Sequence, residues 1–165
     1  MSHRNKLIFI AVALILGSAA QAAILEYSLD RMVESSEAIV RGRVMNLESR
    51  WLDGPGSVIV TDVVFLVDEV LTGEFSAPQQ LNFYVVGGVV DGLGLRQEHQ
   101  PVFHKDEESV LFLWTQPDQN RLAVFNDEQG RYRLVGDTVV NFKQQSIALP
   151  EFREELDWAI QIHKR

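Results

Sequence analysis

Two histidines with nearby carboxylates make the segment 87–108 the part of this chain best suited to metal or acid–base chemistry. The carboxylates beside His99 and His104 are Glu98, Asp106, Glu107 and Glu108. The five-residue spacing puts the histidines on opposite faces of a strand, or about 140° apart on a helix, so only an irregular loop could bring them together. Zinc needs a further ligand, and the chain has no cysteine and no His-Glu-x-x-His motif. We therefore expect no metal or other cofactor. If a metal does bind, His99 and His104 are its candidate ligands.

Two arginines and two tryptophans are better suited to binding. Arg41 and Arg43 alternate with apolar residues and so share one strand face, where they would hold an anion or glycan, or keep that face soluble. Trp51 precedes a Gly- and Pro-rich turn and is a candidate exposed contact. Trp158 flanks the apolar stripe of a C-terminal helix, where it would rim an interface or pack at the core's edge. These four are the candidate binding residues.

Motifs for nucleophilic catalysis and phosphate binding are absent from the sequence. It contains no Gly-x-Ser-x-Gly, no Ser-x-x-Lys and no cysteine, and Gly87-Gly88 is not followed by a Lys-Ser/Thr pair. We name no catalytic residue, and the sequence favours a protein that is not an enzyme. A metal-dependent or other hydrolase using the 87–108 loop is the alternative.

The first 22 residues have the pattern of a cleaved secretory signal peptide. Arg4 and Lys6 precede an apolar run over 7–16, and the small-x-small triplet Ala20-Gln21-Ala22 follows. Since the apolar run spans only about 15 Å as a helix, a retained membrane anchor is the less favoured interpretation. We expect a mature chain of residues 23–165, forming a single domain in the periplasm or the medium, without membrane insertion after cleavage.

The charge of the chain argues against nucleic acid and anionic membrane surfaces as partners. The formal charge is −8. It becomes −10 without residues 1–22, which carry one Arg, one Lys and no acid. An acidic protein of this kind is repelled by phosphate groups, whereas 46% apolar residues suffice for a packed core.

Alternating and β-branched stretches predict a mainly β fold. Strands are expected at 38–47, 58–71, 81–86, 109–115, 121–126 and 131–142. Short and amphipathic helices are expected at 29–36 and 150–164, and the segment 89–108 is expected to be a long loop with a short hairpin. A strand at 58–71 would be about 46 Å long and apolar on both faces, which favours an OB-like barrel of about five to seven strands around which it coils.

Several stretches, taken in order, resemble an uncharacterised family of exported bacterial proteins with a predicted OB-like barrel. The stretches are 28–33, 38–44, 67–73, 85–88, 101–103, 108–113 and 129–134, and the resemblance covers about residues 25–140. The barrel is similar in outline to the netrin-like inhibitory domain of tissue inhibitors of metalloproteinases (TIMP). Those inhibitors chelate zinc through an N-terminal cysteine, which this chain lacks, so only a partner-binding role is implied.

The combined prediction is an exported, soluble, non-enzymatic binding module whose partner is another exported protein. The alternatives are the hydrolase using the 87–108 loop, or a glycan or cell-envelope binder that uses Trp51, Arg41 and Arg43.

Overall fold

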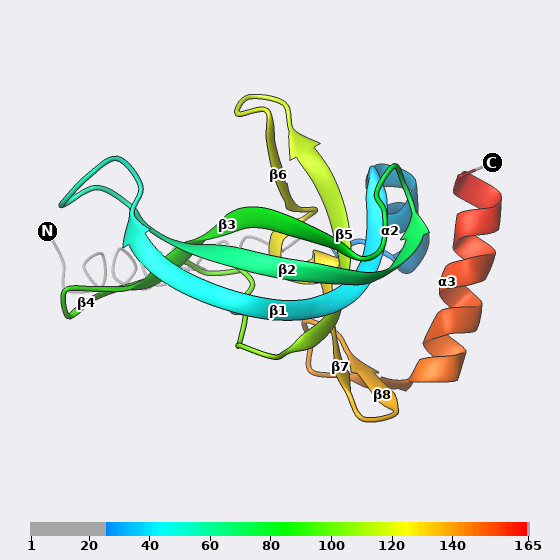
Figure 1. Ribbon diagram of the computed structural model, residues 1–165. Coiled ribbons are helices and arrows are strands. Elements are labelled where there is room, and N and C mark those ends of the chain that lie inside the picture. Colours follow the sequence, from blue (N-terminus) through cyan, green and yellow to red (C-terminus); the bar gives the residue numbers. More distant parts are fainter. Residues whose placement is uncertain (1–25, 165) are drawn as a thin grey trace, which may run out of the picture.

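The computed structural model describes residues 26–164, so the predicted signal peptide lies outside the described residues. In this range two α-helices flank a β-rich body, α2 (Leu29–Ser35) and α3 (Leu149–His163) (Figure 1). The strands are β1 (Ala38–Trp51), β2 (Ile59–Thr72), β3 (Gln79–Val90), β4 (Leu93–Arg96), β5 (Glu108–Gln116), β6 (Arg121–Val124), β7 (Arg131–Val135), β8 (Thr138–Val140) and β9 (Ser146–Ala148). Neither helix has the length and apolar character needed to cross a bilayer.

All strand pairs are antiparallel, and the nine strands form one sheet. The strand order is β4-β3-β2-β1-β5-β7-β8-β9, with β6 paired to β5 beside this path. A mainly β fold with a short N-terminal and a longer C-terminal helix is therefore confirmed. Within residues 26–164 strand pairing does not close the sheet, which is open and curled and has nine strands. The sequence predicted a barrel of about five to seven strands.

The long hairpin of β1 and β2 curls because its pairing is irregular. Register shifts lie between Ile39 and Val40, between Arg41 and Gly42, and between Val44 and Asn46, and such bulges increase the twist and bend of a strand. A Cβ at Gly42 would lie 2.0 Å from the main-chain oxygen of Leu66. Glycine is therefore required at this close approach of the two backbones.

Side chains bridge the gap between β3 and β6, which the curl brings near each other. Arg121 donates from Nη1 to the main-chain oxygen of Tyr84 at 2.9 Å, and its guanidinium carbon lies 3.7 Å from the centre of the Tyr84 ring. The Tyr84 hydroxyl in turn donates to Oε1 of Gln119 at 3.2 Å. Arg121 also donates to Gln116 and Gln119, so its hydrogen bonds hold this edge of the sheet together.

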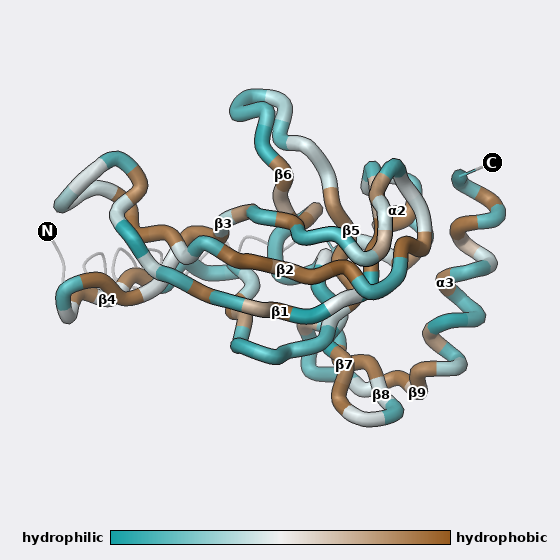
Figure 2. Tube along the Cα trace, viewed as in Figure 1, coloured by the Kyte–Doolittle hydropathy of each residue, from teal (hydrophilic) through white to brown (hydrophobic). Residues whose placement is uncertain are grey.

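Two apolar clusters stabilise the fold on opposite faces of β1 and β5. One lies inside the curl and includes Phe65, Phe83 and Leu113. The other lies between the sheet and the two helices, and includes Phe112 and Phe152. Both faces of β5 are buried as a result, and hydrophobic segments run along β2 and recur on α3 (Figure 2).

Most predicted elements are present, with differences at their ends. The helices begin and end within one residue of the prediction, and Phe152, Leu156 and Ala159 form the buried stripe of α3. The strand predicted to end at 86 continues through Gly87-Gly88 as β3, so its predicted end is wrong. The end of β3 forms a short hairpin with β4 at the start of the segment predicted as a loop. The strand predicted at 131–142 is divided into β7 and β8 by a turn at Gly136, which has a φ of 58°.

Candidate functional site

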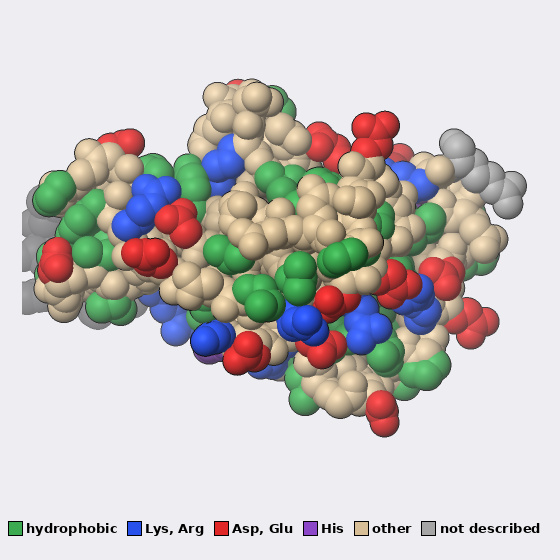
Figure 3. Space-filling view, viewed as in Figure 1, with side chains coloured by type: hydrophobic (Ala, Val, Ile, Leu, Met, Phe, Trp, Pro, Cys, Tyr) green, Lys and Arg blue, Asp and Glu red, His purple; other side chains and the backbone are tan. Residues whose placement is uncertain are grey.

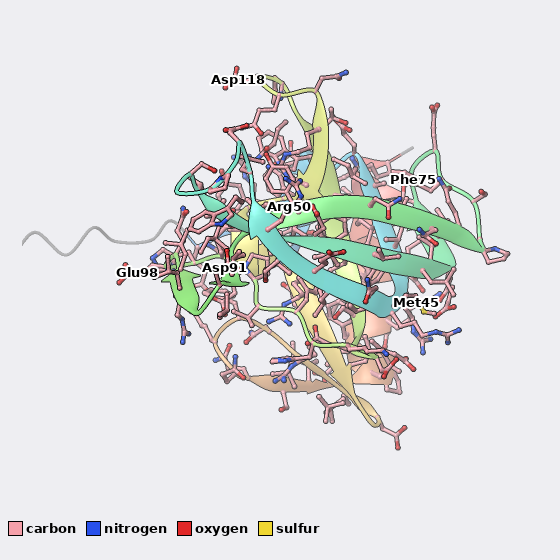
Figure 4. All side chains as sticks on the ribbon, turned by 60° about the vertical axis from the view of Figure 1, so that its left-hand side comes forward. Met45, Arg50, Phe75, Asp91, Glu98 and Asp118 are labelled. Carbon is pink, nitrogen blue, oxygen red and sulfur yellow. The ribbon has the colours of Figure 1, made fainter. Side chains whose placement is uncertain are left out.

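The four predicted binding residues do not form one site. Trp51 ends β1 at one extremity of the sheet, whereas Trp158 lies on α3 at the other (Figure 1). Along β1, ten residues separate Trp51 from Arg41, or about 30 Å of strand. Figure 4 shows Arg50 near one end of β1 and Met45, at the middle of the strand, well away from it. A small ligand could not contact Trp51, Arg41 and Arg43 together.

Arg41 and Arg43 both have carboxylate partners on neighbouring strands. Arg41 Nη2 lies 3.3 Å from Oε2 of Glu108, and Arg43 Nη1 lies 3.7 Å from Oδ2 of Asp68. These side chains are partly exposed, so each ion pair contributes only modestly to stability. An anionic ligand on this face would have to compete with the two carboxylates.

Trp51 is partly exposed and adjoins a second network of paired charges. Arg50 donates from Nε and Nη2 to both carboxylate oxygens of Asp62, at 2.6 and 3.1 Å. This contact, more than any other, raises the pKa of the Arg50 guanidinium. The geometry is the bidentate arrangement typical of strong arginine–carboxylate pairs, so Arg50 is occupied in joining β1 to β2.

The two histidines lie in the exposed connection between β4 and β5. His99 has a left-handed backbone with φ of 66°, and its main-chain oxygen accepts from the Glu128 amide at 2.8 Å. Among residues 26–164, no group of three or more His, Asp or Glu side chains is placed to hold a metal ion. The described residues therefore do not assemble the metal cluster that His99, His104 and their neighbouring carboxylates suggested.

One polar cluster that the sequence did not predict is the buried ion pair of Glu107 and Arg131. Arg131 Nη1 lies 2.6 Å from Oε1 of Glu107, and these side chains are 11% and 5% exposed. The same oxygen accepts from the buried Ser109 hydroxyl at 3.0 Å, and the guanidinium lies over the Phe103 ring. Oε2 of Glu107 and Nε of Arg131 have no hydrogen-bond partner within the described residues. The ion pair ties the connection before β5 to β7, so Glu107 and Arg131 have a structural role.

The surface around Trp158 differs because three of its carboxylates, those of Glu151, Glu154 and Glu155, form no ion pair among the described residues. Trp158 is 59% exposed and Ile162, one turn further along α3, is 51% exposed. A hollow of about 550 Å³ beside Trp158 lies between α2 and α3. Its lining consists of Leu29, Asp30, Glu151, Glu154, Glu155 and Trp158. We call this hollow, with Trp158 at its margin, the interhelix groove.

Three contacts fix the helices on either side of the groove. Lys164 donates from Nζ to the main-chain oxygen of Ser36 at 2.5 Å, where α2 ends. Nε2 of His163 lies 3.7 Å from Oδ1 of Asp30. On the other side of α3, Arg153 is hydrogen-bonded to both carboxylate oxygens of Glu69 on β2, and these bonds are the main cause of the lowered pKa of Glu69. The groove is thus a fixed feature of the fold.

The charge of Glu155 in the groove also acts on a core residue, Tyr132. Tyr132 packs against Phe112 and Phe152 under the helices. Its burial, followed by the charges of Glu155 and Glu26, raises the pKa of its phenol to about 12. Tyr132 therefore remains a neutral core residue at physiological pH.

Comparison with protein-family models, with curated proteins and with solved structures finds no match to this chain. The geometry of the described residues is thus the basis for a functional proposal. The interhelix groove combines the exposed side chain of Trp158 with glutamates that form no ion pair among the described residues.

Proposed function

We propose that this protein is a non-enzymatic binding module that is exported to the periplasm or the medium and contacts another exported protein through α3. The observation that carries the proposal is the exposure of Trp158 and Ile162 beside the buried stripe of α3. Tryptophan is enriched among the residues that dominate interface energies. The export signal in residues 1–22 supports the location.

We further propose kinship with OB-like barrels, in agreement with the sequence resemblance described above. The support is the curl of the β1–β2 hairpin together with the approach of β3 to β6, where Arg121 makes the connection by side-chain contacts. In this view the side chains take the place that strand pairing has in a closed barrel.

A cross-linking pull-down with tagged residues 23–165 tests the binding function. The bait is exposed to periplasmic and culture fractions of the host, and captured proteins are identified by mass spectrometry. Three baits are compared: the natural sequence, Trp158→Ala and Trp51→Ala, with circular dichroism to show that each is folded. We expect one enriched protein that is lost with Trp158→Ala and retained with Trp51→Ala. A partner captured equally by all three baits, or none from either fraction, would overturn the proposal.

A further inference from the structure

We propose that the interhelix groove binds a lysine- or arginine-rich segment of the partner protein. This inference rests on the proposed binding function and specifies the chemistry of the partner. Trp158 would provide a ring face for one cationic side chain, and Glu151, Glu154 and Glu155 would pair with its neighbours along the segment.

The charge of the groove is the first argument. Four of the six residues that line it are acidic and none is Lys or Arg. Glu151, Glu154 and Glu155 form no ion pair within residues 26–164, whereas Arg41, Arg43 and Arg50 on the sheet all have carboxylate partners. The three glutamates of α3 therefore have no ion-pair partner among the described residues, and Figure 3 shows acidic side chains over α3.

The spacing along α3 is the second argument. Glu154 and Glu155 follow Glu151 by three and four residues, and Trp158 follows them by four and three, so the four side chains lie on one side of the helix. Like charges at these intervals repel each other, and a bound cation relieves the repulsion. Binding of cations therefore lowers the electrostatic energy of this helix face, so a basic segment should bind more tightly than a neutral one.

The aromatic ring is the third argument, since it selects the kind of cation. A lysine or arginine head group over the face of tryptophan gains a cation–π contact, and carboxylates beside the ring add charge-assisted hydrogen bonds. Trp158 also borders a second open hollow, on the side of α3 that carries Pro150 and Gln161. The surface from Glu151 to Ile162 extends about 16 Å along the helix, the length of about five extended residues. A peptide segment fits this length better than a small compact cation.

The test is titration of the folded chain, residues 23–165, with a nine-residue lysine-rich peptide, followed by calorimetry at low and at physiological salt. The groove variant Glu151→Gln/Glu154→Gln/Glu155→Gln removes three charges. The matched control Asp91→Asn/Glu98→Gln/Asp118→Asn removes three exposed charges elsewhere, at the residues labelled in Figure 4. These three also form no ion pair within the described residues. Trp158→Ala completes the set.

We expect the groove variant to weaken binding at least tenfold and Trp158→Ala to weaken it about fivefold, while the control variant changes it less than twofold. The total charge is the same in the two triple variants, so a difference between them locates the binding. Equal losses in both, or full affinity in the groove variant, would overturn the proposal. If Trp158→Ala abolishes capture of the natural partner while the lysine-rich peptide fails to distinguish the variants, the binding function stands and the cationic chemistry is wrong. If capture does not depend on Trp158, the proposed function itself fails.

Discussion

Replacing Arg131 by methionine would leave the carboxylate of Glu107 buried without a counter-charge. The Glu107 side chain is 5% exposed, so water cannot take the place of the guanidinium. Among the described residues, the Ser109 hydroxyl would be the side-chain donor left to the carboxylate. Methionine keeps an apolar stem near Phe103, so the change removes the charge with little loss of packing. Breaking one side of a buried ion pair costs about 3–5 kcal/mol.

The size of this loss can be measured by urea unfolding at neutral pH. With a denaturant slope of about 1–3 kcal/mol/M, Arg131→Met should lower the unfolding midpoint by at least about 1 M. The double variant Glu107→Gln/Arg131→Met removes both charges and keeps an oxygen that accepts from Ser109. Because two orphaned atoms already make the natural pair imperfect, we expect the double variant to recover most of the loss.

Two results would refute this reasoning. If Arg131→Met costs less than about 1 kcal/mol, the carboxylate is effectively solvated or the pair is unimportant. If the double variant is as unstable as the sum of the two single variants, the side chains act independently and the ion pair is not the cause.

Three further perturbations test other parts of the structure. Gly42→Ala should cost at least about 1–3 kcal/mol in thermal unfolding, because its Cβ would meet the backbone of β2, while Gly94→Ala, in open surroundings, serves as the control and should cost less than 1. Burial raises the pKa of Tyr132 from its ordinary value of 10 to about 12. The neutral phenol therefore contributes fully to the free energy of unfolding below pH 10, and this contribution is lost as pH rises to about 12. In Tyr132→Phe, measured by urea unfolding against pH, the alkaline loss of stability should be smaller by about 2–3 kcal/mol. The pKa of Glu69 is lowered by Arg153, so the stability difference between the natural sequence and Glu69→Gln should be present at pH 6 and vanish as pH falls below the ordinary carboxyl range; a difference that persists at pH 2 would contradict this.

The elements were predictable because their signals are local. The apolar stripe of α3 and the length of β2 follow from residue patterns within each segment, and both are confirmed. The bulge beside Gly42 is also a local signal, since glycine within an alternating strand marks a close approach or a bend. These features do not depend on how distant segments meet.

The arrangement of the elements was harder to predict because it depends on distant contacts. The segment around Glu107 resembles a solvated turn in sequence, and its burial results from Arg131 on a later strand. The interhelix groove likewise requires α2 and α3, from opposite ends of the described chain, to lie side by side. The sequence placed Trp158 beside the buried stripe, but only the docked helices show how its neighbours combine into a groove.

The sharing of β1 and β5 between two apolar clusters has a consequence for the order of folding. Residues of the first cluster lie on β1, β2, β3, β5 and β6 and in the connection before β5, so this half can form without α3. The second cluster needs Phe152 and Leu156, which follow every strand in the chain. Until α3 docks, the outer faces of Ile39 and Phe112 would remain uncovered and prone to association with other chains. The helix that presents the groove is therefore also the last part of the domain required for a stable, monodisperse fold.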